Sequence, residues 1–284
     1  MIHHSLYKPT IAKAFDDFFS NIGAKLARKF LPSPYSFLSP RVNTDLEFET
    51  VTAEYVRKEL KSLSIAKATG MDGIPPRLLK VAADEICVPL AHILNSSLST
   101  GVFPSEWKTA RVTPIFKSGA KDDVNNYRPI SVLPVVSKLL ERVVHDQLYR
   151  MLTSAGAISE WQSGFRSGFS TETAASYLVD HILSGMNGVG KKKVKMLTGV
   201  LFLDLKKAFD TVDHVTLLAM LEHAAVQGVA LQWFTSYLSN RSQLVQIEDC
   251  LSDKLAIDYG VPQGSILGPL LFSLYINDIV HSCH

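Results

Sequence analysis

An aspartate stands directly after an apolar run in the second half of the chain. Asp204 follows residues 197–203, which read Leu-Thr-Gly-Val-Leu-Phe-Leu. The composition and length of this run predict a buried β-strand, so Asp204 would lie at the end of a strand, at the rim of a sheet. A carboxylate held there can coordinate a divalent metal ion while the strand fixes its position. The alternative is that Asp204 only caps the helix that follows.

A second candidate is a loop rich in glycine and proline. It spans residues 260–272 and reads Gly-Val-Pro-Gln-Gly-Ser-Ile-Leu-Gly-Pro-Leu-Leu-Phe. Its glycines allow the backbone to approach a ligand closely, and Gln263 would supply an amide on that surface. Taken alone, the loop is better explained as a plain turn before a helix.

Together with four other strings in a fixed order, these segments resemble the reverse transcriptases of non-LTR retrotransposons (LINE-type elements). Residues 202–214 (Phe-Leu-Asp-Leu-Lys-Lys-Ala-Phe-Asp-Thr-Val-Asp-His) look like the first catalytic block of that family, and residues 260–272 resemble the next block. The upstream strings resemble the segment before the fingers, the fingers themselves and the block between fingers and palm: residues 67–75, 107–117, 126–133 and 162–171. Six long strings in the family's order are not expected by chance, and the resemblance covers nearly the whole chain.

The resemblance implies a fold and an activity. The fold would be α/β (α+β), a right-hand polymerase with fingers and a partial palm, which copies an RNA template from a DNA primer using deoxynucleoside triphosphates. Catalysis would use two Mg²⁺ ions held by three aspartates. Asp204 matches the first of these aspartates, and the carbonyl of Leu205 would reach one metal ion. Phe209 matches the steric gate, whose ring excludes a ribose 2′-hydroxyl; the alternative for Phe209 is core packing.

The resemblance also implies binding residues. Lys117 and Arg128 match the finger residues that grip the triphosphate, a task suited to one point charge and one planar fork. Gln263 and Gly264 match the surface behind the incoming base and the template. Arg166 is a candidate for nucleic-acid binding, with a solvated loop arginine as its alternative.

The sequence departs from the family at its third block, an apolar hairpin carrying Ala-Asp-Asp. No such hairpin occurs before His284, and the thumb is also absent. The adjacent pairs Asp16–Asp17 and Asp122–Asp123 are interpreted as solvated charges. The two-metal site is therefore expected to be incomplete and this chain to be inactive as it stands.

Other functions remain open at this point. The chain could be a non-catalytic nucleic-acid-binding relic of a retroelement, which would differ only in lacking catalysis. An RNA-dependent RNA polymerase is disfavoured by Phe209, because such an enzyme must admit the 2′-hydroxyl. A group II intron maturase is disfavoured by the string at residues 67–75.

Helices and strands must interleave to position these residues. Hydrophobic spacing and cap signals predict helices over 15–30, from Thr52, from Pro75-Pro76 towards Gly101, and over 135–152, 171–186, 215–225, 231–238 and 269–280, with strands over 112–116, 197–203, 244–247 and 255–259. A chain ending at His284 should leave strand 197–203 as an exposed edge and uncover part of the last helix. Three prolines within 31–40 predict a linker, so residues 1–50 are expected to form an N-terminal helix and linker and 51–284 the fingers and partial palm.

The amino-acid composition places few limits on the function and location of the protein. Lys and Arg total 29 against 27 Asp and Glu, a net charge of +2, so any basic groove must be local. Three scattered cysteines indicate a reducing compartment. No signal peptide and no apolar run near the roughly 20 residues of a membrane span occur. We expect an intracellular protein without membrane contact, found in the cytoplasm and nucleus by resemblance to the family; the sequence does not indicate an oligomeric state.

Overall fold

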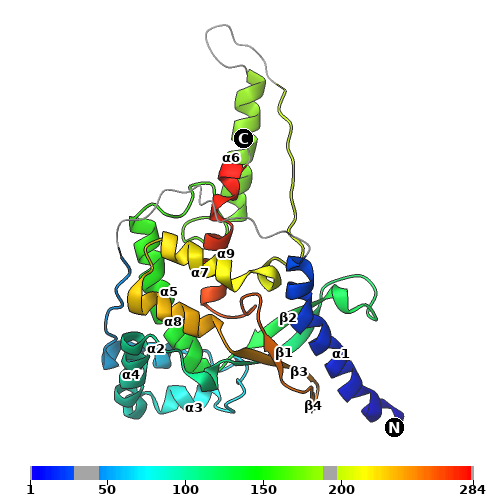
Figure 1. Ribbon diagram of the computed structural model, residues 1–284, viewed down its shortest axis with the longest axis vertical. Coiled ribbons are helices and arrows are strands. Elements are labelled where there is room, and N and C mark those ends of the chain that lie inside the picture. Colours follow the sequence, from blue (N-terminus) through cyan, green and yellow to red (C-terminus); the bar gives the residue numbers. More distant parts are fainter. Residues whose placement is uncertain (1, 29–44, 188–196, 283–284) are drawn as a thin grey trace.

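The computed structural model describes residues 2–28, 45–187 and 197–282, and the fold is mixed α/β (Figure 1). Its elements in chain order are α1 Ile2–Ala27, α2 Ala53–Ser62, α3 Pro76–Val81, α4 Ala83–Thr100, η1 Ser105–Trp107, β1 Thr109–Phe116, η2 Val124–Asn126, β2 Tyr127–Val132, α5 Val135–Ser154, α6 Thr171–Asn187, η3 Ala208–Thr211, α7 His214–His223, α8 Gly228–Leu238, β3 Arg241–Ile247, β4 Cys250–Leu251, β5 Leu255–Ile257, α9 Leu267–Tyr275 and η4 Asn277–Ser282. None of the helices in these ranges is both long and apolar enough to cross a membrane.

The described strands form one small mixed sheet. Its order is β2-β1-β3-β4, with β5 paired to β3. Strands β1 and β2 form an antiparallel hairpin. Strands β1 and β3 run parallel, although their register partners Ala110 and Gln243 are 133 residues apart in the sequence. The expected pairing of the two strands near 244–247 and 255–259 is confirmed, since β3 and β5 are antiparallel neighbours.

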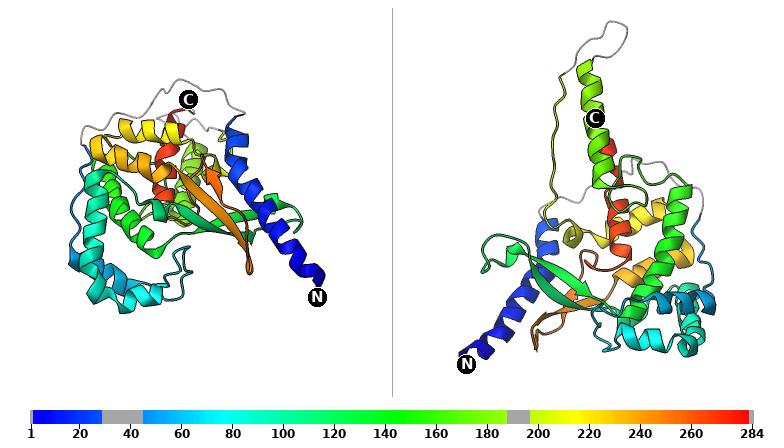
Figure 2. Two further views of the ribbon diagram at one scale, coloured as in Figure 1. Left: turned by 60° about the horizontal axis from the view of Figure 1, so that its bottom comes forward. Right: turned by 180° about the vertical axis from the view of Figure 1, so that it is seen from behind.

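Helix α1 lies across one face of this sheet (Figure 2). Its Phe15 and Phe19 pack with Val112 of β1 and Val245 of β3. The sequence predicted that this helix begins at residue 15, but it begins at Ile2. It packs on the same body as the sheet. The proline-rich stretch 31–40 and the basic stretch 191–195 lie outside the described residues.

Asp16 corrects one expectation from the sequence. It was interpreted as a solvated charge, but it is only 1% exposed. Its carboxylate accepts hydrogen bonds from Gln243 Nε2 at 2.8 Å and Ser252 Oγ at 2.6 Å. Asp16 therefore fastens α1 to the sheet, because a buried carboxylate is stable only where donors replace its lost water.

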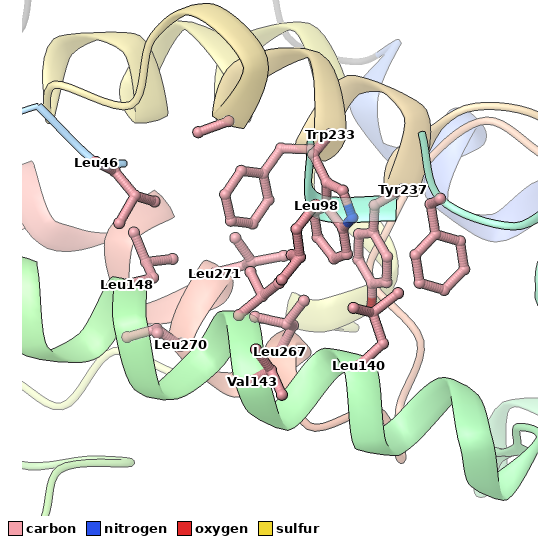
Figure 3. Packing of buried hydrophobic residues seen from close by; sticks show 14 of the residues in the cluster. Leu46, Leu98, Leu140, Val143, Leu148, Trp233, Tyr237, Leu267, Leu270 and Leu271 are labelled. Carbon is pink, nitrogen blue, oxygen red and sulfur yellow. The ribbon is translucent and has the colours of Figure 1, made fainter. Parts of the chain in front are cut away.

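The main hydrophobic core lies among the helices and is built around α5. The helix predicted over 135–152 has one side that is buried, formed by Leu139, Leu140, Val143, Val144 and Leu148. Figure 3 shows the α5 side chains meeting Trp233 and Tyr237 of α8 and the leucines of α9. Spacing at three and four residues gives α5 one continuous apolar side, and burial of that side stabilises the helix.

The predicted helix boundaries are confirmed where a local hydrogen bond sets them. Thr52 Oγ1 accepts from Tyr55 N at 3.1 Å and caps α2. Gly101 ends α4 with φ +68°, in the left-handed region that glycine adopts without strain. Pro76 opens α3 directly after Pro75. These signals depend on only a few neighbouring residues, so the sequence alone can locate them.

The predicted buried strand over 197–203 is wrong. No strand pairing is present there within the described residues, and Leu201 and Phe202 are 81% and 82% exposed. Figure 1 shows this extended segment rising beside α6, away from the body of the molecule. An apolar run becomes a strand only where a neighbouring strand supplies hydrogen-bond partners, and none of the described strands lies against it.

The last helix is better covered than expected. The apolar stretch from Pro269 divides into α9 and the short turn η4. Leu270, Leu271, Phe272 and Leu274 are all buried, so the expectation that this side would be uncovered is wrong. Packing against α5 and α7 covers it.

Candidate nucleic-acid and nucleotide site

Strand β2 brings three of the sequence blocks together. At one end of the strand, Lys207 Nζ donates to Tyr127 O at 3.1 Å. Near the other end, Ser131 N donates to Gln263 O at 2.7 Å. The β1–β2 hairpin, the Asp204 block (residues 202–214) and the Gly-Pro loop (residues 260–272) lie far apart in the sequence and are therefore joined by direct hydrogen bonds.

The Asp204 block and the Gly-Pro loop are also joined to each other. Gln263 Nε2 donates to Asp210 Oδ1 at 2.8 Å. Backbone bonds run from Gly260 N to Val212 O at 2.7 Å and from Val261 N to Phe209 O at 2.9 Å. Burial raises the pKa of the Asp210 carboxyl, and the hydrogen bond from Gln263 and the charge of Lys207 oppose that rise. The amide of Gln263 is thus held by a half-buried acid.

Gly264 sits where no other residue fits without strain. Its φ is +121°, and a Cβ there would lie 2.5 Å from Ser131 O. Glycine is the residue that allows such a backbone conformation and such a close approach. The exposed Gly264 therefore lets the loop lie directly on β2.

Phe209 is half-buried in an aromatic cluster beside the loop. Its ring stacks on Phe272 with 4.7 Å between centroids and meets the edge of Phe165 at 5.9 Å. This geometry holds the ring in one orientation. The same contacts agree with core packing and with a fixed steric gate.

Lys117 and Arg128 lie on the hairpin of β1 and β2. Arg128 pairs across the hairpin with Ile115, and Lys117 comes one residue after Phe116, at the end of β1. Lys117 N donates to Asn126 O at 2.8 Å, which fixes its backbone. Both side chains are exposed, so both charged groups can reach an anionic ligand.

Arg166 is engaged within its own loop. Its Nη1 donates to Ser159 O at 2.8 Å and to Gln162 O at 3.1 Å, and its guanidinium lies 4.4 Å from the ring centroid of Phe169. These contacts shape the loop between α5 and α6. Any contact of Arg166 with nucleic acid would use its remaining donors.

Asp204 and Leu205 do not join the other candidates. Both are exposed and belong to the unpaired segment that follows residue 196. Among the residues described, no group of three or more His, Cys, Asp or Glu side chains could hold a metal ion. One carboxylate and one carbonyl do not fit a two-ion site, which requires several oxygen ligands for each ion.

Two residues that sequence analysis did not select connect the blocks. Lys207 has φ +54°, and its Nζ lies 5.3 Å from the ring centroid of Phe18 in α1 as well as near Tyr127 O. Burial lowers the pKa of Lys207. Ser131 contacts the loop through its backbone N–H, which donates to Gln263 O. Both lay inside the family-like strings, but contacts with distant backbone groups carry no sequence signal.

A small, partly open cavity lies beside these residues. A cavity of about 50 Å³ lies between α1, β3 and the loop, lined in part by Asp210, Arg241 and Gln263. Pockets for small molecules usually measure roughly 300–1,000 Å³. This cavity is therefore smaller than a typical small-molecule pocket.

Comparisons with known proteins agree with this arrangement. Residues 117–284 match the family described as reverse transcriptase (RNA-dependent DNA polymerase). The chain is 32% identical over 246 residues to the probable RNA-directed DNA polymerase from transposon BS of Drosophila melanogaster, which covers 85% of this chain and 26% of the relative. It is 32% identical over 252 residues to the RNA-directed DNA polymerase from mobile element jockey of the same fly, covering 88% of this chain and 26% of the relative.

A third relative is similar to the same extent. The jockey polymerase of Drosophila funebris is 34% identical over 238 residues, which are 82% of this chain and 25% of the relative. The chain thus spans about a quarter of the length of the curated relatives it matches. The family match covers strand β2 of the hairpin, the Asp204 block and the Gly-Pro loop, which the structure joins by hydrogen bonds at β2. The chain belongs to the reverse transcriptase family, among the polymerases of non-LTR retrotransposons.

Proposed function

We propose that this chain supplies the fingers and part of the palm of an RNA-directed DNA polymerase and binds a primed RNA template. The observation that carries the proposal is the hydrogen-bonded convergence of three blocks on β2, from Lys207 at Tyr127 to Gln263 at Ser131. The β1–β2 hairpin would form the fingers side of the surface and the Gly-Pro loop the palm side. Residues 1–50 would add a helix that supports the sheet from its other face.

The roles of single residues follow from this surface. Lys117 and Arg128, exposed on the hairpin, would contact the triphosphate. Gln263 and Gly264 would lie behind the incoming base and template. The stacking of Phe209 on Phe272 supports its role as a gate, because sugar exclusion requires a ring that cannot move aside. Arg166 would contribute at most a peripheral phosphate contact.

Catalysis needs more carboxylates than the described residues group together. Two Mg²⁺ ions would supply the chemistry when bound, and Asp204 with the carbonyl of Leu205 would contribute only part of their ligands. We therefore propose that the 284-residue chain binds template and primer inside the cell, in cytoplasm and nucleus, without extending the primer. This keeps the binding-only relic as the second candidate, favoured by the exposed and solitary Asp204.

The binding proposal is tested with a fluorescent primed RNA template titrated with the purified chain at several salt concentrations. Affinity should fall steeply with salt, since each phosphate contact releases condensed counterions. Lys117→Ala and Arg128→Ala should each weaken binding and reduce the slope of log affinity against log salt by about 1. Lys58→Ala is the matched control, an exposed lysine on α2, which packs on α4. An affinity that does not change with salt, or an equal effect of Lys58→Ala, would contradict the proposal.

Primer extension tests the proposed lack of catalysis. With Mg²⁺ and deoxynucleotides we expect no product from this chain, and Asp204→Asn should leave template binding unchanged. Metal-dependent extension that Asp204→Asn abolishes would show instead that the chain assembles a complete site.

A further inference from the structure

Glu141 is a buried acid with no role in the sites described above. It lies on α5 inside the main core and is 0% exposed. Acidic side chains are almost never fully buried unless specific partners replace the lost water. Its partners therefore indicate what the residue does.

The partners of Glu141 are backbone amides from a distant part of the chain. Its Oε2 accepts from Ile266 N at 2.7 Å and from Leu267 N at 3.4 Å. Its Oε1 lies 3.4 Å from Ser137 Oγ, one turn earlier on α5. The bonds cross 125 residues of sequence, so they fix one segment of the fold against another.

These amides belong to the start of α9. The first N–H groups of a helix have no partner within it, and Ile266 at the cap position has no side chain that can accept a hydrogen bond. Ser265 Oγ accepts from Gly268 N at 3.0 Å. Glu141 supplies the remaining acceptor, and its carboxylate also suits the positive end of the helix dipole.

The same bonds fix the end of the Gly-Pro loop. The loop is held at its start by Gly260 N on Val212 O and at its middle by Ser131 N on Gln263 O. Glu141 holds its end at residues 266 and 267. Gln263 lies at the second of these attachments and Gly264 lies between the second and the third, so the position of both depends on these two attachments.

We propose that Glu141 is a positioning residue of the Gly-Pro loop. It fixes Gln263 and Gly264 through the amides of Ile266 and Leu267. What the loop binds rests on the function proposed above, whereas its fixation by Glu141 does not. Glu141 itself is enclosed in the core, so it would act only through the loop.

Glu141 could act through its negative charge or through its hydrogen-bond acceptor oxygen, and the surrounding charges allow these two effects to be separated. Burial raises the pKa of the Glu141 carboxyl, and the charge of Arg241 on β3, the two amides and Lys138 oppose this. No ion pair to Glu141 occurs among the residues described, and Arg241 Nη1 instead donates to Tyr237 O at 2.9 Å. The acceptor oxygen should therefore matter more than the charge, and glutamine should replace it.

The test compares amide hydrogen exchange in wild type, Glu141→Gln, Glu141→Ala and Gln147→Ala. Gln147 is the matched control because it is also buried on α5, but it bonds to the backbone of Glu49 at 2.8 Å. In Glu141→Ala, the amides of Ile266, Leu267 and the loop should exchange at least about 10-fold faster, as expected when a charged hydrogen bond is lost. Glu141→Gln should stay near wild type, and Gln147→Ala should leave the loop unchanged.

A further variant guards against failure of the alanine variant to fold. Glu141→Asp keeps the charge but withdraws the carboxylate by one methylene, so its loop should exchange faster than that of Glu141→Gln. Equal loop exchange in Glu141→Ala and Gln147→Ala would overturn the proposal, as would a Gln variant as fast as the Ala or Asp variant. Affinity for the primed template is measured in parallel. If wild type does not bind template, the proposed function fails, while the exchange rates still decide the role of Glu141.

Discussion

A methyl group added at Gly264 should be costly for reasons visible in the backbone. In Gly264→Ala the new Cβ would lie 2.5 Å from Ser131 O, at a residue whose φ is +121°. Ser131 is held in β2 opposite Val112, so it cannot easily move. Since carbon and oxygen normally stay more than about 3 Å apart, the loop must shift by several tenths of an ångström.

The magnitude follows from two contributions. A side chain in this sparsely populated backbone region costs about 1–3 kcal/mol. Movement of the loop would also break the 2.7 Å bond from Ser131 N to Gln263 O, worth about 0.5–1.5 kcal/mol. We expect the free energy of unfolding to fall by about 2–4 kcal/mol, a large part of the 5–15 kcal/mol typical of a domain.

Gly73→Ala provides the matched control. Gly73 also has positive φ, +68°, but a Cβ there meets nothing within 4 Å. It should lose only about 1 kcal/mol from backbone strain, and the effect of Gly→Ala on the unfolded chain is shared by both variants. Urea denaturation measures both, and template affinity should fall only for Gly264→Ala. Equal losses of stability would refute the argument from contact with Ser131.

Three further predictions concern other parts of the molecule. Burial raises the folded pKa of Asp16 above 3.8, and its hydrogen bonds to Ser252 and Gln243 oppose that rise. Wild type should therefore lose stability relative to Asp16→Asn as the pH rises from about 3.8 through the folded pKa, measured by urea denaturation. A stability difference that does not change with pH would show that Asp16 is not the titrating group. Leu201→Ser with Phe202→Ser should reduce aggregation, measured by light scattering, without lowering the melting temperature, because both side chains are exposed; a lower melting temperature would mean that they are packed. In a longer chain carrying the third aspartate block, Phe209→Val should raise ribonucleotide relative to deoxynucleotide incorporation in primer extension, and an unchanged ratio would assign the ring to packing.

The sequence by itself determined the features that depend on neighbouring residues. The cap at Thr52, the helix end at Gly101 and the apolar stripe of α5 are each specified within one or two turns of chain, so the structure has them where they were predicted. The six family-like strings likewise established membership of the reverse transcriptase family. Long sequence strings identify a family even when the tertiary contacts of their residues are unknown.

Only the tertiary structure decided which groups are buried and what they bond to. Asp16 looks like a surface charge until Gln243, 227 residues away, donates to it. Residues 197–203 look like a buried strand, but the described fold places no strand beside them. Gln263 and Asp210 are joined in the same way, by contact across the fold. A hydrogen bond needs a donor and an acceptor, and a strand needs a neighbouring strand. The sequence around one partner does not show whether the fold places the other partner beside it.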